Sequence, residues 1–153
     1  MSSSQNHDLP ALGFAKALAE EDRKLLATFG DFTVAEQGET IIQEGKAQDA
    51  LFLVISGNLH VQTNQTGRTI LLNSLRSGDT IGEVNIFDPG EASATVTPNE
   101  FSVLWSITRD KLQSFMDSHP AAASQLLLSV AVLLSKRLRK TNEKAAITQD
   151  SPI

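Results

Sequence analysis

One stretch of the sequence, residues 78–97, combines the residue types that could bind an anion. It reads GDTIGEVNIFDPGEASATVT. After the turn at Gly78, the chain passes through Gly82 and Glu83 into four residues that could form one helical turn. Amide groups at the start of such a turn lack partners, and the helix dipole favours a negative charge there. The stretch therefore predicts either an anion site or a turn and short helix that close a β-barrel without a ligand.

Other kinds of site find little support in the sequence. The chain has no cysteine, which excludes disulfides, thiolate nucleophiles and thiolate-bound zinc. His7, His60 and His119 are far apart, and no two histidines have the spacing of metal ligands. No serine lies in a Gly-x-Ser-x-Gly context, and no Gly-x-x-x-x-Gly-Lys-Ser/Thr phosphate loop occurs. We therefore expect no catalytic residues, no metal, no tightly bound cofactor and no enzymatic activity.

Composition and charge indicate one soluble domain of 153 residues. The net charge of −5 disfavours a dedicated nucleic-acid binder. The charge is uneven, because residues 31–107 hold ten acidic and three basic residues, whereas residues 136–144 hold five of the 13 basic ones. The middle of the chain should therefore repel anions at long range.

Neither end of the chain has the pattern of a targeting or membrane segment. Residues 1–8 are polar, with no basic start and no apolar stretch, so we predict a disordered leader and not a signal peptide. No run approaches the roughly 20 apolar residues of a membrane span. Residues 148–153 are predicted to be a frayed tail. These features predict a cytoplasmic protein without a transmembrane segment.

Residues 9–147 are predicted to form a single domain. Residues 9–29 have helical periodicity that Gly13 and an acidic cluster divide into two short helices. Thr108 is a good cap for a helix over 108–117, and Pro120 suits the first position of another over 120–145. Between them, residues 31–107 hold short β-branched segments with glycine turns at intervals of about ten residues, which indicates an antiparallel sandwich or barrel. The predicted strands are 32–34, 40–42, 51–55, 59–61, 69–72, 94–96 and 101–107, with a hairpin loop at 64–67.

The helix predicted over 120–145 has two properties of its own. One face repeats with the 4-3-4-3 spacing of a seam that binds a partner helix, which predicts a homodimer. Leu126, Val130 and Leu133 widen this apolar stripe, so the first half should also pack on the barrel. The basic segment 136–144 could contact an anionic membrane or RNA, or could be a solvated helix face. The predicted dimer residues are Leu127, Ala131, Leu134, Leu138 and Thr141.

With these elements in order, residues 10–145 resemble the cyclic nucleotide-binding domain family. The motifs that carry the resemblance are 38–45 (GETIIQEG), 53–57 (LVISG), 75–79 (LRSGD) and 82–83 (GE) followed by 93–95 (SAT). The resemblance implies a mainly β fold: a jelly-roll barrel, or double-stranded β-helix, with N-terminal helices and a long C-terminal helix.

The resemblance also implies that residues 78–97 are a phosphate-binding cassette. In that case the Glu83 carboxylate binds the ribose 2′-hydroxyl, and backbone amides near Gly82, Ser93 and Ala94 bind the cyclic phosphate. An arginine would stand just before Ser93 to neutralise this phosphate. The implied ligand-binding residues are Ile81, Gly82, Glu83, Val84, Ala92, Ser93, Ala94 and Thr95.

The cassette departs from the family pattern at Ile81, at Asn85 and above all at Ala92, which occupies the arginine position. Losing a buried cation beside a phosphate costs about 3–5 kcal/mol, which is about 100- to 4000-fold in affinity. We therefore expect a regulatory or interaction module that binds cAMP or cGMP weakly or not at all, with an unidentified protein partner.

Two other functions remain open. The alternative is a genuine cAMP or cGMP sensor that binds through Glu83, Ser93 and backbone amides and signals through the C-terminal helix. A small β-barrel enzyme is a more remote possibility. Since the sequence stops soon after the long helix, we expect no direct DNA binding by this chain.

Overall fold

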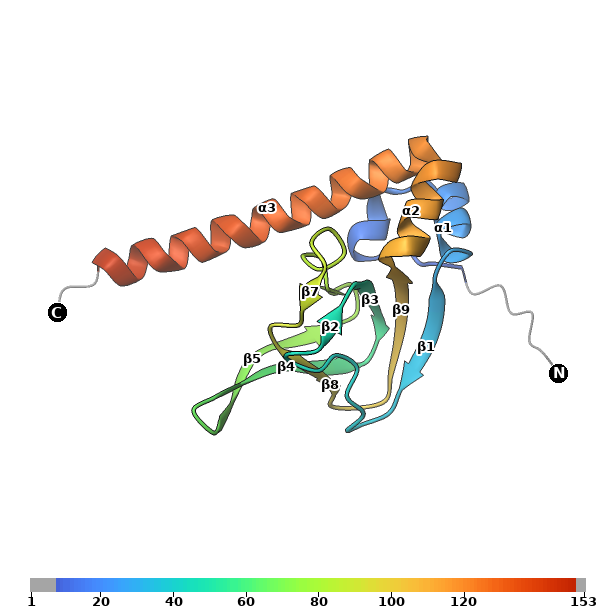
Figure 1. Ribbon diagram of the computed structural model, residues 1–153. Coiled ribbons are helices and arrows are strands. Elements are labelled where there is room, and N and C mark those ends of the chain that lie inside the picture. Colours follow the sequence, from blue (N-terminus) through green and yellow to red (C-terminus); the bar gives the residue numbers. More distant parts are fainter. Residues whose placement is uncertain (1–7, 151–153) are drawn as a thin grey trace.

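The computed structural model describes residues 8–150, with side chains up to Ala145. A β-barrel has its helices gathered at one end, and the longest helix crosses above the barrel and extends past it (Figure 1). The elements are η1 (a 3₁₀ helix, Gly13–Ala17), α1 (Glu20–Ala27), β1 (Asp31–Ala35), β2 (Ala47–Gln48), β3 (Ala50–Ser56), β4 (Asn58–Gln65), β5 (Arg68–Arg76), β6 (Thr80–Ile81), β7 (Gly90–Glu91), β8 (Thr95–Pro98), β9 (Ser102–Thr108), α2 (Arg109–Ser118) and α3 (Pro120–Asp150).

The barrel consists of antiparallel sheets, which confirms the predicted fold class. A four-stranded sheet has the order β1-β9-β3-β6, a three-stranded sheet has the order β5-β4-β8, and β2 pairs with β7. The long strands β4 and β5 form the predicted hairpin, whose turn places Thr66 and Gly67 at positive φ, 51° and 77°. Two consecutive residues at positive φ match the twist of a tight hairpin.

Alternation along β3 and β9 divides the interior into two apolar clusters. In β9, Trp105 and Ile107 belong to the cluster under the helices, whereas Leu104 belongs to the cluster inside the barrel. In β3, Leu53 and Val54 divide in the same way. Successive side chains of a strand point to opposite faces, so these two strands connect the barrel with the helical layer.

Helix α3 is part of the core over its first half. Leu126 and Val130 are each 1% exposed, in the same cluster as Phe14, Trp105 and Phe115. The stretch Pro120–Ala145 is also long and apolar enough, by length and composition alone, to cross a membrane. A core helix of a globular protein satisfies the same criteria, so this property is weak evidence for a membrane span.

Several boundaries differ from the predicted ones. Residues 40–42 do not form the predicted strand: an isolated bridge joins Ile42 to Val96, and the amides of Ile41 and Ile42 both donate to the Val96 carbonyl. The strands β2, β6 and β7 were not predicted, because two residues are too short for a periodic pattern. The N-terminal region does contain two short helices, and α3 runs five residues past the predicted end at 145. Residues 1–7 of the predicted leader and 151–153 of the predicted tail lie outside the described residues.

The packing of α3 can be tested with two neighbouring leucines. We expect Leu126→Ala to lower the free energy of unfolding by about 2–4 kcal/mol, because a side chain that is 1% exposed would leave a cavity. Leu128, which is 61% exposed, is the matched control, and Leu128→Ala should change the free energy by less than about 0.5 kcal/mol. Urea denaturation measures both values, and equal effects would contradict the docking of α3 on the barrel.

Candidate functional site

A cavity of about 520 Å³ lies between the barrel and the second half of α3. Its volume is in the range of small-molecule sites. One wall comes from residues of the 78–97 stretch and the neighbouring strands, and the other from side chains of α3. The cavity is lined by Gly82, Glu83, Val84, Ala92, Ser93 and Ala94 on the barrel side and by Arg137, Lys140, Thr141 and Lys144 on the helix side, among others.

The turn that presents Glu83 begins at a glycine for a steric reason. Gly82 has φ = +84°, and a Cβ at this position would overlap the carbonyl oxygen of Ala50 in β3. The chain then makes the single helical turn predicted from the sequence, because the Ile86 amide donates to the Gly82 carbonyl at 3.0 Å. Ile86 is 1% exposed and anchors the turn in the core under the helices. Glu83 is thereby fixed at the edge of the cavity.

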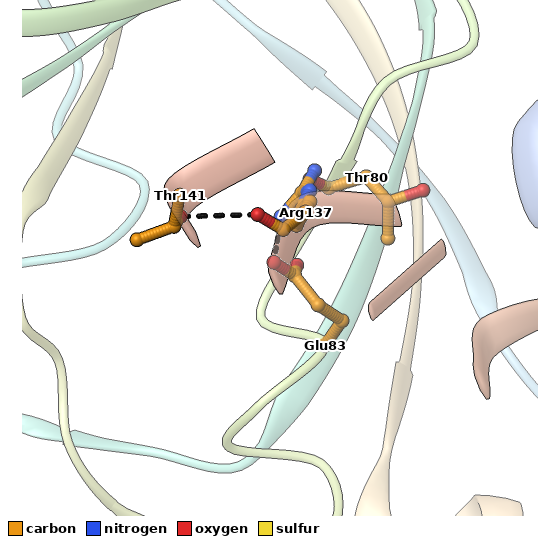
Figure 2. A network of polar contacts seen from close by, with 4 residues as sticks. All are labelled: Thr80, Glu83, Arg137 and Thr141. Carbon is orange, nitrogen blue, oxygen red and sulfur yellow. Dashed lines mark hydrogen bonds and ion pairs between the residues drawn. The ribbon is translucent and has the colours of Figure 1, made fainter. Parts of the chain in front are cut away.

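The carboxylate of Glu83 is buried, and the side chain is 10% exposed. Its Oε1 forms a salt bridge with the guanidinium of Arg137 in α3 (Figure 2). Its Oε2 is buried and has no hydrogen-bond partner among the residues that the structure describes. A buried acceptor without a donor is unfavourable by roughly 1–3 kcal/mol. The site thus has a place for one further hydrogen-bond donor.

Arg137 joins α3 to the barrel through two contacts. Besides its salt bridge with Glu83, its Nη2 donates to the Thr80 carbonyl at 3.0 Å, across 57 residues of sequence. Burial lowers the pKa of the Arg137 guanidinium, and the negative charge of Asp79 partly opposes this. The group stays protonated near neutral pH because arginine titrates far above it. One turn further along α3, the Thr141 hydroxyl donates to the Arg137 carbonyl (Figure 2).

The second part of the barrel wall follows β7. The amides of Ser93 and Ala94 donate no hydrogen bond to any residue that the structure describes, and both residues line the cavity. Ala92 is 6% exposed and packs in the cluster inside the barrel, while its amide donates to the Lys46 carbonyl at 2.8 Å. The position at which the resemblance implies an arginine therefore contributes a buried methyl group and no charge.

Seven of the eight predicted ligand-binding residues line this one cavity, and Thr95 does not. The Thr95 hydroxyl instead accepts a hydrogen bond from the Glu44 amide at 3.0 Å. Val96, the next residue of β8, faces the cavity. Since neighbouring strand residues point to opposite faces, the two cannot both line it. The seven residues brought together are Ile81, Gly82, Glu83, Val84, Ala92, Ser93 and Ala94.

Three basic residues of α3 line the cavity, namely Arg137, Lys140 and Lys144. Their sequence pattern predicts a solvated helix face or a contact for a membrane or RNA, and not a place in this site. The sequence contains one pattern that could have predicted their position, which is the spacing of the apolar residues on the core-facing side of α3. Positions 126, 130 and 133 continue with the same 4-3-4 steps to 137, 140 and 144, so one helix face is apolar over the core and basic over the cavity.

The predicted dimer seam is only partly free on the surface. Ala131 and Leu138 are exposed, and Leu138 is 62% exposed. Leu134 is half-buried and packs against the core, and Leu127 is also half-buried. Thr141 is exposed but lines the cavity. The pairing of two chains through this seam stays a prediction.

Comparison with known proteins agrees with this geometry. Residues 32–119 match the family model described as the cyclic nucleotide-binding domain. The chain is 34% identical over 111 residues to the CRP-like cAMP-activated global transcriptional regulator of Mycobacterium tuberculosis, covering 72% of this chain and 48% of the relative. The chain thus spans about half the length of this regulator.

Two solved structures are similar over most of the chain. The N-terminal domain of a transcriptional regulator from Streptomyces coelicolor is 29% identical with a TM-score of 0.74, and the match covers 91% of this chain and 95% of that one. The catabolite activator protein of Thermus thermophilus is 26% identical with a TM-score of 0.79, and the match covers 89% and 62%, respectively.

The turn at Gly82 yields a prediction about the shape of the site. We expect Gly82→Ala to destabilise the fold by about 2 kcal/mol or more, since it combines a positive φ with an overlap at the Ala50 carbonyl. Gly90→Ala is the matched control, because Gly90 has an ordinary φ and its added Cβ would meet no atom within 4 Å. Thermal unfolding of both variants measures the difference. A Gly82→Ala protein as stable as the control would contradict the close approach of the turn to β3.

Proposed function

Because this chain belongs to the cyclic nucleotide-binding domain family, we propose that it is a non-enzymatic regulatory module that binds a cyclic nucleotide between the barrel and α3. The observation that carries the proposal is the buried Oε2 of Glu83, for which the described part of the chain provides no hydrogen-bond partner. Buried polar groups in folded proteins nearly always have one. A ribose hydroxyl that enters the cavity would supply the missing donor.

We propose that the amides of Ser93 and Ala94, which have no partner among the described residues, donate hydrogen bonds to the phosphate of the nucleotide. Backbone N–H groups that lack partners and face a cavity bind anions through their dipoles. A cyclic nucleotide carries one hydroxyl and one anionic phosphate on the same rigid ring system, so Glu83 and the two amides would hold it at two points. The nucleotide would then lie beneath α3, whose Thr141 lines the cavity.

The proposed output of binding is a change in α3. In the described structure, Arg137 holds the helix to the barrel through Glu83 and the Thr80 carbonyl. A ribose that binds Glu83 would share this carboxylate with Arg137 and so change the helix contact. In this proposal α3 has two positions, one with the cavity empty and one with it occupied. A ligand that makes better contacts in one position shifts the equilibrium toward that position.

Relatives and composition support a regulatory role over an enzymatic one. The Mycobacterium tuberculosis relative is named as a transcriptional regulator, and among the described residues no three His, Asp or Glu side chains are grouped in a way that could hold a metal. We also propose a cytoplasmic location, because the relative is named as a transcriptional regulator. We expect no DNA contact from the barrel, because residues 31–107 are strongly acidic.

A second candidate is an interaction module that has lost its nucleotide and binds an unidentified protein. Ala92 favours this function, because it leaves the barrel side of the cavity without a cation. The salt bridge to Arg137 also satisfies one Glu83 oxygen without a ligand. The two candidates differ in whether a nucleotide binds at all.

Calorimetric titration separates the two candidates. We expect saturable binding of cAMP or cGMP, and 2′-deoxy-cAMP should bind about 10- to 100-fold more weakly than cAMP if the buried carboxylate accepts the ribose hydroxyl. In Glu83→Gln, the difference between cAMP and its deoxy analogue should shrink, because the strong acceptor is gone. No heat with either nucleotide at millimolar concentration would refute the proposal and leave the interaction module.

We also propose that the module is a homodimer that pairs through α3, and Leu138 is the position for a test. We expect Leu138→Asp to give a monomer in sedimentation, since this side chain is 62% exposed and its change does not disturb the core of one chain. Lys136→Asp introduces the same side chain on the opposite side of the helix and should leave the dimer intact. If Leu138→Asp has the same mass as the unmodified protein, the predicted seam is not the interface.

A further inference from the structure

A second cavity of about 510 Å³ lies beside α3, and we call it the η1 cavity. It is bounded by η1, by the turn at residues 78–80 and by the stretch 125–137 of α3. Thr80 and Arg137 line both this cavity and the one that contains Glu83, so the hydrogen bond between them marks the boundary. No other described residue lines both cavities. The η1 cavity is therefore a separate space, and its volume is in the range of small-molecule sites.

Apolar side chains form much of the η1 cavity. Phe14 of η1 is 3% exposed, whereas Leu128 and Val132 of α3 are 61% and 45% exposed. Leu128 and Val132 lie four residues apart, so they share one face of the helix. Exposed apolar side chains that gather at a cavity are typical of a binding site. This lining therefore favours a ligand with an apolar body.

One side of the η1 cavity is fixed by the close approach of two backbone segments. Gly13 of η1 has φ = +51°, and a Cβ at this position would overlap the carbonyl oxygen of Gly78. The next residue, Phe14, packs with its ring centroid 6.2 Å from that of the buried Trp105. These contacts hold η1 against the turn and the core, so the cavity keeps its shape without a ligand. A ligand can thus bind without a large cost for ordering the site.

The charged groups at the η1 cavity are mostly basic. Lys16 of η1 and Lys136 of α3 line it, and neither ammonium forms a hydrogen bond or ion pair with a described residue. Arg137 is paired with Glu83, which belongs to the other cavity. Asp79 is the one carboxylate among the described lining residues, and its Oδ2 accepts a hydrogen bond from a backbone amide at 2.8 Å. Two ammonium groups beside one carboxylate favour a ligand with a single negative charge.

We infer that the η1 cavity binds a free amphiphilic carboxylate, such as a medium-chain fatty acid. Its alkyl chain lies against Leu128 and Val132, and its carboxylate is held by the ammonium groups of the two lysines. Lys136 follows Val132 by four residues, so this row of α3 changes from apolar to basic along the ligand. Lys136 also lies on the side of the helix opposite Leu138, so a dimer through the predicted seam leaves this row open. The inference does not depend on nucleotide binding, because it uses a separate cavity.

The ligand chemistry is tested with four probes by calorimetry on the unmodified protein. Decanoate, kept below its critical micelle concentration, should bind saturably. We expect 1-decanol, which lacks the charge, to bind about 5- to 20-fold more weakly, and decyltrimethylammonium, which reverses it, more weakly still. Hexanoate has four methylene groups fewer and should bind about 10- to 100-fold more weakly than decanoate.

The position of the site is tested with variants of its lining. We expect Lys16→Gln/Lys136→Gln to bind decanoate about 5- to 20-fold more weakly and 1-decanol with unchanged affinity, whereas a damaged fold would weaken both. Leu128→Ala should weaken both ligands about 3- to 10-fold, because it removes apolar contact and not charge. The matched control is Lys111→Gln/Arg139→Gln, which removes two exposed charges that line neither cavity and should change neither affinity.

Each other outcome overturns the inference. It fails if decanoate gives no saturable heat, if decyltrimethylammonium binds as tightly, or if the control variant weakens decanoate as much as Lys16→Gln/Lys136→Gln. Binding by the Leu138→Asp monomer alone would mean that a second copy covers the surface. Adsorption to phosphatidylglycerol vesicles without binding of decanoate would assign the surface to a membrane. No nucleotide is present in these titrations, so a failure of the proposed function would leave their interpretation unchanged.

Discussion

The salt bridge between Glu83 and Arg137 is the contact on which the arrangement of the site depends. It joins a turn of the barrel to a helix that begins far later in the sequence, and it does so at a buried carboxylate. A buried charge is tolerated only when it is paired, so the pair determines where the second half of α3 lies. Without it, the helix would be fixed to the domain by the apolar face that contains Leu126 and Val130 and by the hydrogen bond from Arg137 to the Thr80 carbonyl. The cavity lies where this ionic contact joins the second half of α3 to the barrel.

The rest of the site follows from backbone constraints on the barrel. Gly82 is needed where the turn approaches β3, and Ile86 fixes the same turn from the core. On the other side of the cavity, two amides after β7 have no partner within the described part of the chain, while Ala92 packs in the barrel interior. The barrel therefore provides the fixed Glu83 and the backbone amides, and α3 provides the basic side chains that line the cavity. This division differs from the arrangement that the resemblance implies, in which one cassette contains both.

Local patterns predicted the barrel and the turn at Gly82, because each depends on neighbouring residues, whereas the residues of the cassette were implied by the family resemblance. They failed where a residue's role depends on distant parts of the chain. Residues 40–42 are β-branched like a strand, yet they form one bridge with Val96. Thr95 matches the motif, but its place in β8 directs the hydroxyl toward Glu44. The basic residues of α3 were hardest to assign, because a charged helix face is usually solvated. Only the direction of α3 over the barrel brings Arg137 to Glu83.

One face of α3 changes from leucine and valine to arginine and lysine within a single turn, between Leu133 and Arg137. The two halves of the helix are consequently sensitive to different solvent conditions. Apolar burial is strengthened by salts such as sulfate, whereas ionic contacts near the surface weaken as the Debye length falls from about 10 Å at 0.1 M salt to about 3 Å at 1 M. Salt should therefore screen the exposed basic half of α3 more than it affects the apolar half, while the pair at the buried Glu83 carboxylate is screened less. The two halves of one helix thus respond in opposite directions to the electrolyte around the domain.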